Sequence, residues 1–566
     1  MARRFRLSAV VIAAWLVAAP AFGQATTQSQ DVSDTDSWIR AESDHFVVYG
    51  DWTQADTIKR VKALEQFHYF LNIVLPPDDP DAPEPKLTIY LVRDHTLLQW
   101  VDPRNAAGLY SACKEGVVAF SSQADFDPSK WVHASKDVPA QDESQVILFH
   151  EYTHHVMFRH TAATYPLWYI EGYADYFSTF AYDGQWAWIG LPPNTSSNTL
   201  DQVNWGGFDR VLKPDAQLSS GLATVDGADP LIFYAKAWLL THYMMNDPER
   251  AKMLDAYMAR LDKGEDPVAA FTAATGIDVD GELPRRLHAY SKAMPYRKIE
   301  LPAMPDAAVS VTPLDATADS YQLLYGALKT CPPNAVGTLE LKYLRAAGNA
   351  DAIADLAPPK ESKSWDKLVA DMRARAPAVA KSREYQFALA YGEILFGNPH
   401  APLTWLATIA KDDADYPRAQ YLVGRAWLAA AGGQTGADRS ISLKTASQAL
   451  AIAYTANPDD AATNYFLALS LDTGDEPPSD NAVNAAVGAV DAAPSVYDYA
   501  ELAAIFELRR NDRDDAIALL KPFSNDPHAP KRAERVRGAL AAISQGADIE
   551  KVRAALKNDD DTSAAK

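Results

Sequence analysis

His150-Glu151-Tyr152-Thr153-His154 is the stretch on which the interpretation of this 566-residue chain depends. Residues four apart lie on one face of a helix, so His150 and His154 can present two imidazoles to one metal ion. Glu151 lies one position later, beside that face, where it can accept a proton from a water molecule at the metal. The stretch therefore predicts a helix that carries two metal ligands and a general base.

A third ligand is expected from Glu171, which follows His154 along the chain within the motif Trp168-x-x-Glu171-Gly172. Two histidines and one carboxylate, with the fourth position left to water, are the donor set of a catalytic zinc ion. A histidine pair on an ordinary helix is the alternative. The apolar residues 146–149 favour burial of this helix, and buried histidine and glutamate side chains need partners, which a metal supplies.

The N-terminal residues 1–23 have the order of a secretory signal peptide, with a basic start, an apolar run and a small-residue end. The apolar run has about 13 residues, short of the roughly 20 that a membrane span needs. We therefore expect cleavage before Gln24 rather than a membrane anchor, and no later stretch is long and apolar enough to cross a bilayer. The expected location is outside the cytoplasm, periplasmic if the host is Gram-negative and otherwise secreted.

The net charge of −21 argues against nucleic acid and anionic membrane surfaces as partners. Cys113 and Cys331 are the two cysteines of the chain. An exported protein permits a disulfide between them, and two buried free thiols fit the sequence at least as well. Neither cysteine has the spacing of a zinc ligand.

The segments before the metal motif alternate between strand and helix patterns. Strands are expected over residues 43–49, 87–92 and 116–120, and a helix over 55–75. This order suits a small sheet packed against helices. After the motif, helices are expected over about 231–245 and 248–261, and three prolines between residues 297 and 315 mark the best domain boundary.

The second half of the chain is rich in alanine and has an internal period. Pro458, Pro494 and Pro527 each follow a helical pair, and their spacing along the chain is nearly even. This spacing is close to the period of roughly 34 residues that defines tetratricopeptide repeats. A helical domain without repeats is the alternative.

The two motifs together resemble those of the gluzincin metallopeptidases. The matching residues are His150-Glu151-x-x-His154 and Trp168-x-x-Glu171-Gly172-x-Ala174-Asp175. More specifically, they resemble the bacterial "peptidase MA-like" domains, which often occur with helical repeats. The resemblance covers residues 37–295, about half of the chain. It implies that His150, His154 and Glu171 bind Zn2+ and that Glu151 is the general base.

The resemblance also implies two supporting residues. Asp175 matches an acid that accepts a hydrogen bond from a zinc-ligand histidine; a carboxylate on the helix surface is the alternative. Tyr234 matches the tyrosine of the Tyr-Glu-Lys-Gly segment of zinc aminopeptidases, which stabilises the tetrahedral intermediate, although the Glu and Gly that follow it in that segment are Ala235 and Ala237 here. A packing tyrosine is the alternative for Tyr234, and His242 is a weaker candidate donor.

The region of Gly108-Leu109-Tyr110 and residues 117–120 is expected to supply an edge strand that pairs with the backbone of a substrate. The chain has no Gly-x-Met-Glu-Asn segment, with which related aminopeptidases hold the free amine of the substrate. This departure favours an endopeptidase over an aminopeptidase.

These features predict an α+β zincin-like catalytic domain, with a small mixed sheet and active-site helices, followed by an all-α helical-repeat domain. The expected division of the chain is a signal peptide at 1–23, a disordered linker at 24–36, the gluzincin-like domain at 37–297, a linker and helical connector at 298–380, tetratricopeptide-like repeats at 381–557 and a disordered tail at 558–566.

The expected function is that of an exported zinc-dependent peptidase acting on a peptide or protein substrate, with a second protein partner on the repeats. One alternative is a catalytically silent metal-binding protein whose repeats form an interaction scaffold. Metal-assisted hydrolysis of a non-peptide amide is a further alternative. A structural zinc site is normally closed by four protein ligands, and the sequence suggests three.

Overall fold

The computed structural model describes most of the chain after residue 37. The described residues are 38–76, 84–93, 98, 108–122, 138–139, 141–160, 165–193, 196, 199–200, 205–213, 230–314, 318–332, 335–340, 361–379, 382–474, 477–526 and 529–557. The expected signal peptide, the linker after it and the C-terminal tail lie outside these residues. Within them, no helix is both long and apolar enough to span a membrane.

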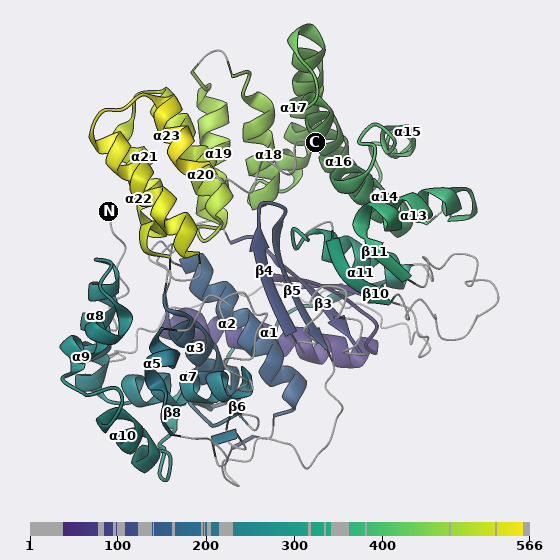
Figure 1. The fold of residues 1–566 in the computed structure, drawn as a ribbon. Coiled ribbons are helices and arrows are strands. Elements are labelled where there is room, and N and C mark those ends of the chain that lie inside the picture. The colour runs from purple at the N-terminus through teal and green to yellow at the C-terminus, as the bar shows by residue number, and fades with distance from the viewer. Residues whose placement is uncertain are drawn as a thin grey trace.

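A mixed six-stranded sheet forms the centre of the first half (Figure 1). Its strands, in the order in which they pair, are β4 (Gly108–Cys113), β5 (Gly116–Ser122), β3 (Leu87–Val92), β2 (Phe46–Gly50), β1 (Ile39–Glu42) and β9 (Ser310–Pro313). The strands β2, β3 and β5 are parallel, whereas β4, β1 and β9 are antiparallel to their neighbours. The sheet thus ends in the antiparallel strand β4 on one side.

Two layers of helices cover the sheet. Successive residues of a strand point to opposite faces, so Ile89 and Leu91 of β3 pack with α1 (Gln54–Val74) and α2 (Glu143–His160). Tyr90 and Val92 pack on the other face, against α11 (Ala318–Leu328). The helix α1 begins where Thr53 accepts a hydrogen bond from the amide of Asp56.

Helices pack below the sheet and complete the first half. The helix α3 (Leu167–Ser178) lies against α2 and against α7 (Pro230–Met245). The contact with α7 is very close, since a Cβ on Gly172 would lie 2.4 Å from the carbonyl oxygen of Ala237. The remaining helices there are α5 (Phe208–Leu212), α8 (Pro248–Leu261), α9 (Pro267–Thr275) and α10 (Glu282–Tyr290).

The expected domain boundary at 297/298 needs correction. A small three-stranded sheet joins β6 (Ala181–Tyr182), β7 (Trp186–Ile189) and β8 (Arg297–Glu300). Residues 310–313 form β9, which pairs with β1. The proline-rich segment is therefore part of the first half, because its backbone completes two sheets there.

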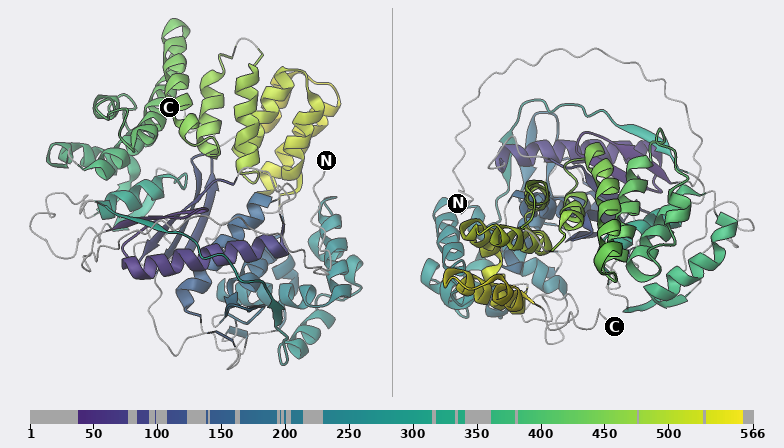
Figure 2. Two further views of the ribbon diagram at one scale, coloured as in Figure 1. Left: turned by 180° about the vertical axis from the view of Figure 1, so that it is seen from behind. Right: turned by 90° about the horizontal axis from the view of Figure 1, so that it is seen from above.

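The second half consists of helices that stack in antiparallel pairs (Figures 1 and 2). The pairs are α16 (Tyr416–Ala431) with α17 (Gly436–Ala456), α18 (Ala461–Leu471) with α19 (Asp480–Ala492), α20 (Tyr497–Arg509) with α21 (Arg513–Leu520), and α22 (Pro530–Ser544) with α23 (Ile549–Leu556). A 3-10 helix, η3 (Lys521–Asn525), precedes the last pair. Pro458 and Pro494 lie between pairs, as the period predicted, whereas Pro527 lies outside the described residues.

A few elements connect the two halves. They are β10 (Ala335–Glu340), β11 (Glu361–Ser364), α13 (Trp365–Val379), α14 (Arg383–Phe396) and α15 (Leu403–Leu406). A disulfide joins Cys113 at the end of β4 to Cys331, 218 residues later. Of the two states that the sequence left open for these cysteines, the structure shows the paired one.

Candidate metal centre

The helix α2 is fixed at its N-terminus by an ion pair with α1. Asp142 precedes the helix and accepts a hydrogen bond from the amide of Gln145 at 2.8 Å. The guanidinium of Arg60 donates to both oxygens of Asp142, at 2.8 and 2.9 Å. Burial opposes the charge of Asp142, but Arg60 and the hydrogen bonds from Ser144 and Gln145 together outweigh burial and lower the pKa of this carboxyl group. The start of α2 is therefore held against α1, which sets the position of the two motif histidines.

The structure brings His150, His154 and Glu171 together. The Nε2 atoms of the two histidines are 3.0 Å apart, and Glu171 Oε2 lies 3.2 Å from His150 Nε2 and 3.4 Å from His154 Nε2. The two imidazole rings are nearly perpendicular, at 88°. We call these three residues the metal group. Ligands at zinc distances of about 2.0–2.1 Å in a tetrahedron are separated by about 3.4 Å, so a zinc ion fits between these atoms.

Asp175 lies one turn after Glu171 and faces the other side of His150. His150 Nδ1 donates to Asp175 Oδ1 at 2.8 Å, which leaves Nε2 with its lone pair toward the metal group. Burial opposes a charge on His150, but its hydrogen bonds to Asp175 and Glu171 outweigh burial and raise the pKa of the ring well above its usual value. Without a metal ion, Nε2 therefore carries a proton and donates it to Glu171, and a bound metal ion takes the place of this proton. The site thus attracts positive charge at the position where a cation would lie.

His154 is held mainly by packing. Its ring stacks on Phe158, with ring centroids 6.0 Å apart. Among the residues that the structure describes, its Nδ1 atom is buried without a hydrogen-bond partner. The two histidines therefore differ, because Asp175 fixes the tautomer of His150 only.

Glu151 lies between the metal group and the edge strand β4. The backbone amide of Tyr110 donates to its carboxylate, and a Cβ on Gly108 would lie 2.7 Å from Glu151 Oε1. Burial is the main cause of a raised pKa for Glu151. A carboxylate whose pKa is raised is a stronger base near neutral pH. The edge strand proposed from sequence is thus adjacent to this carboxylate.

Tyr234 and His242 both lie on α7, and they differ in their surroundings. Tyr234 is 37% exposed and lies one helical turn before Ala237, where α7 meets α3 beside Glu171. His242 is completely buried, with Nε2 2.9 Å from the carbonyl oxygen of Gly190 and Nδ1 2.9 Å from the hydroxyl of Tyr290. These hydrogen bonds occupy both ring nitrogens, so His242 belongs to the core.

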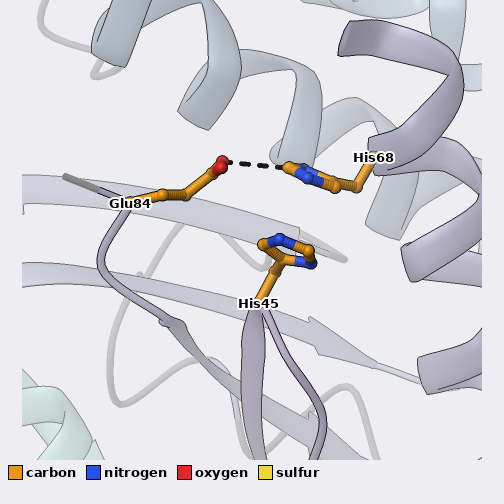
Figure 3. Close-up of side chains that lie close together, drawn as sticks. All are labelled: His45, His68 and Glu84. Atoms are coloured by element: carbon orange, nitrogen blue, oxygen red, sulfur yellow. Dashed lines mark ion pairs between the residues drawn. The ribbon is translucent and has the colours of Figure 1, made fainter. Parts of the chain in front are cut away.

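A second group of His and Glu side chains lies on the far side of α2, and the sequence pattern did not indicate it. Figure 3 shows His45, His68 and Glu84, which come from three separate segments. His68 Nδ1 lies 3.7 Å from Glu84 Oε1. Burial lowers the pKa of His68 to about 3, so this ring is neutral at physiological pH and the contact is not an ion pair there.

The geometry of this second group differs from that of the metal group. The rings of His45 and His68 stack with an angle of 28°, so one ion cannot lie in the plane of both. The ring nitrogens also have other partners, since His68 Nδ1 is 2.7 Å from the hydroxyl of Tyr152 and His45 Nδ1 is 2.7 Å from Glu65 Oε2. We therefore assign a structural role to this group.

Comparisons with known proteins add little to this geometry. No family model and no curated protein matches the chain. A solved structure of a thermophilic TPR protein from Thermus thermophilus is similar over 32% of this chain and 91% of its own, with 18% identity and a TM-score of 0.26. A similarity this weak carries no argument about fold or function.

Proposed function

We propose that this chain is a zinc-dependent peptidase in which His150, His154 and Glu171 hold the metal and Glu151 is the general base. The observation that supports this most is the convergence of three donor atoms at 3.0 to 3.4 Å, from two helices that pack against each other. Three donors leave one tetrahedral position open, as in catalytic sites. Among the described residues, this group has no fourth His, Cys, Asp or Glu donor.

The donor set suits zinc in its chemistry as well as its spacing. Imidazole nitrogens and a carboxylate are typical zinc ligands, and the ring of His150 is oriented by Asp175. A zinc ion bound there supplies an acidified water and a Lewis acid for a carbonyl group. The remaining chemistry belongs to side chains of this chain.

Glu151 is positioned to move a proton. Its carboxylate is buried beside the metal group, and burial raises its pKa. It therefore accepts a proton from the attacking water and returns it to the leaving amine. Tyr234, which is partly exposed on α7, is the proposed donor to the oxyanion.

The substrate and the compartment are part of the same proposal. The edge strand β4, beside Glu151, suits an extended peptide that adds to the sheet. The disulfide between Cys113 and Cys331 supports an oxidising compartment, in agreement with export. In the alternative role, as a catalytically silent scaffold, the metal group would bind zinc but the protein would hydrolyse no peptide.

The test is the zinc content and casein hydrolysis of the purified protein, beside Glu151→Gln. We expect one zinc per chain in both proteins and a loss of hydrolysis of at least about 100-fold in the variant. Glu143→Gln, at the start of the same helix, is the matched control and should keep both properties.

Three results contradict the proposal in part or in full. Hydrolysis that survives in Glu151→Gln excludes this residue as the base. Zinc without hydrolysis of casein or of a peptide library by either protein favours the scaffold. A natural chain that binds no more zinc than His154→Ala does would exclude the metal site.

A further inference from the structure

The hairpin of β4 and β5 projects from the sheet into the second half of the chain (Figures 1 and 2). Its end, which we call the hairpin tip, consists of residues 113–116. Helices α14, α16, α18 and α20 surround this tip, and three of them begin the helical pairs described above. These four helices therefore contact a distant segment of the same chain.

Glu115 of the hairpin tip is enclosed by the second half. It is 1% exposed and forms an ion pair with Arg425 of α16, whose second nitrogen lies 3.0 Å from Glu115 Oε1. The hydroxyl of Tyr391 on α14 donates to the same carboxylate at 2.6 Å. Arg425 also lies over the ring of Phe466 on α18, 3.4 Å from its centroid. A buried pair with this many partners holds its two sides in one geometry.

Two further links hold the same tip. The hydroxyl of Tyr499 on α20 donates to the carbonyl oxygens of Cys113 and Lys114, each at 3.2 Å. The disulfide ties Cys113 to Cys331, just after α11. Ala112 and Val117, on either side of the tip, pack on a cluster formed by alanines of α18 and α19 and by Tyr499 of α20.

The opposite end of β4 lies at the candidate active site. Gly108, the first residue of β4, is in contact with Glu151, and the amide of Tyr110 donates to Glu151. The strand has six residues and spans about 17 Å between these two ends. The strand β4 thus connects the hairpin tip, which is held by the surrounding helices, with Glu151, the proposed general base.

The second half also contacts the helices on the other side of the metal group. Asn525 of η3 donates to the carbonyl oxygen of Asp262, at the end of α8, at 2.7 Å. The helix α8 packs on α7, which packs on the helix that carries Glu171. The second half is therefore in contact with both the strand side and the helix side of the site.

We propose that the second half is a positioning element for the candidate active site, and that it holds β4 beside Glu151 by gripping the hairpin tip. This inference rests on the proposed function for its catalytic meaning. The face of the helical pairs that contacts the hairpin tip is thus occupied by the chain itself. A protein partner would have to bind to another surface of these helices.

The test loosens the contacts of the hairpin tip without removing its buried charges, because loss of Glu115 or Arg425 alone would leave an unpaired buried charge and strongly destabilise the protein. Tyr499→Phe removes the two hydrogen bonds, and Cys113→Ser with Cys331→Ser removes the disulfide. The full chain carrying all three changes is compared with the natural chain by hydrogen exchange and mass spectrometry. Tyr454→Phe, an exposed tyrosine on α17, is the matched control.

We expect the amides of residues 109–113 to exchange at least tenfold faster in the triple variant, while those of β3 keep their rates. The zinc content should not change, and kcat/KM should fall about tenfold, mainly through a higher KM, because a loose strand aligns substrate poorly. Unchanged exchange in β4, or equal acceleration in β3 and β4, overturns the proposal. The exchange result does not depend on hydrolysis, so its failure is distinguishable from failure of the Glu151→Gln test.

Discussion

Asp175 Oδ1 accepts a hydrogen bond from His150 Nδ1 at 2.8 Å, one helical turn after Glu171. The bond leaves the other ring nitrogen of His150 facing the metal group. Asp175→Asn retains the size of the side chain, but its amide group can turn its nitrogen toward His150 Nδ1. The variant therefore no longer favours the tautomer that has its proton on Nδ1.

We expect Asp175→Asn to weaken zinc binding by about 10- to 100-fold, without a change in fold. Competition with a chromophoric chelator measures this affinity. Asp306→Asn, at an exposed carboxylate, should bind zinc as the natural chain does. Equal affinities in all three proteins would refute the orienting role of Asp175.

Gly108→Ala should affect hydrolysis and not metal binding. The added methyl group would lie 2.7 Å from Glu151 Oε1 and 2.7 Å from Ile147 Cγ2, so the carboxylate must move. A displacement of about 1 Å can cost on the order of 100-fold in rate. We expect kcat to fall by about 10- to 100-fold at unchanged zinc content. An active variant would show that the position of Glu151 is not critical.

Gly172→Ala should destabilise the first half. Its Cβ would lie 2.2 Å from Thr241 Oγ1 and 2.4 Å from the carbonyl oxygen of Ala237, which forces α3 and α7 apart. Overpacking of this kind costs about 1–3 kcal/mol. Gly538→Ala, in an open position of α22, should be neutral or stabilising by roughly 0.5–1 kcal/mol. Urea unfolding compares the two, and equal free energies of unfolding would argue against close packing at Gly172.

The buried ring of His68 makes stability depend on pH. Its pKa is about 3 in the folded chain because of burial, whereas an unfolded histidine titrates near 6.5. Below pH 6.5 the unfolded state binds a proton that the folded state does not, so the free energy of unfolding falls as the pH is lowered toward 3.

Between pH 6.5 and 4.5 this effect of His68 amounts to about 2 kcal/mol. We expect His68→Gln to lose less stability than the natural chain over this interval, as measured by urea unfolding at each pH. Burial opposes the charge of Glu65, but its bonds to His45 outweigh burial and lower the pKa to about 2. The stability that ionised Glu65 contributes is therefore lost only below its unfolded pKa of about 4.3, outside this interval. Parallel pH profiles for the two proteins would contradict the assignment to His68.

Local patterns predicted the local structure well. The strand at 87–92 and the helix at 248–261 have the expected bounds, because side-chain periodicity reports the buried face of one element. The residues expected to form a metal site do lie together, since helix geometry fixes the spacing of His150 and His154. That they hold zinc stays a prediction.

Pairings between distant segments have no local signal. The strand β9 pairs with β1 from the opposite end of the first half, although its own sequence resembles a proline-rich linker. Glu115 finds Arg425 across 310 residues, and each looks like an ordinary surface charge in sequence. Only the folded chain shows that Glu115 lies at a turn inserted among helices, which is why the sequence did not indicate the grip on the hairpin.

The disulfide between Cys113 and Cys331 closes a covalent ring that contains the whole metal group. A single break in the backbone anywhere within this ring opens it but releases no fragment. A chain nicked there by a protease would migrate as one species in gel electrophoresis until its disulfide is reduced.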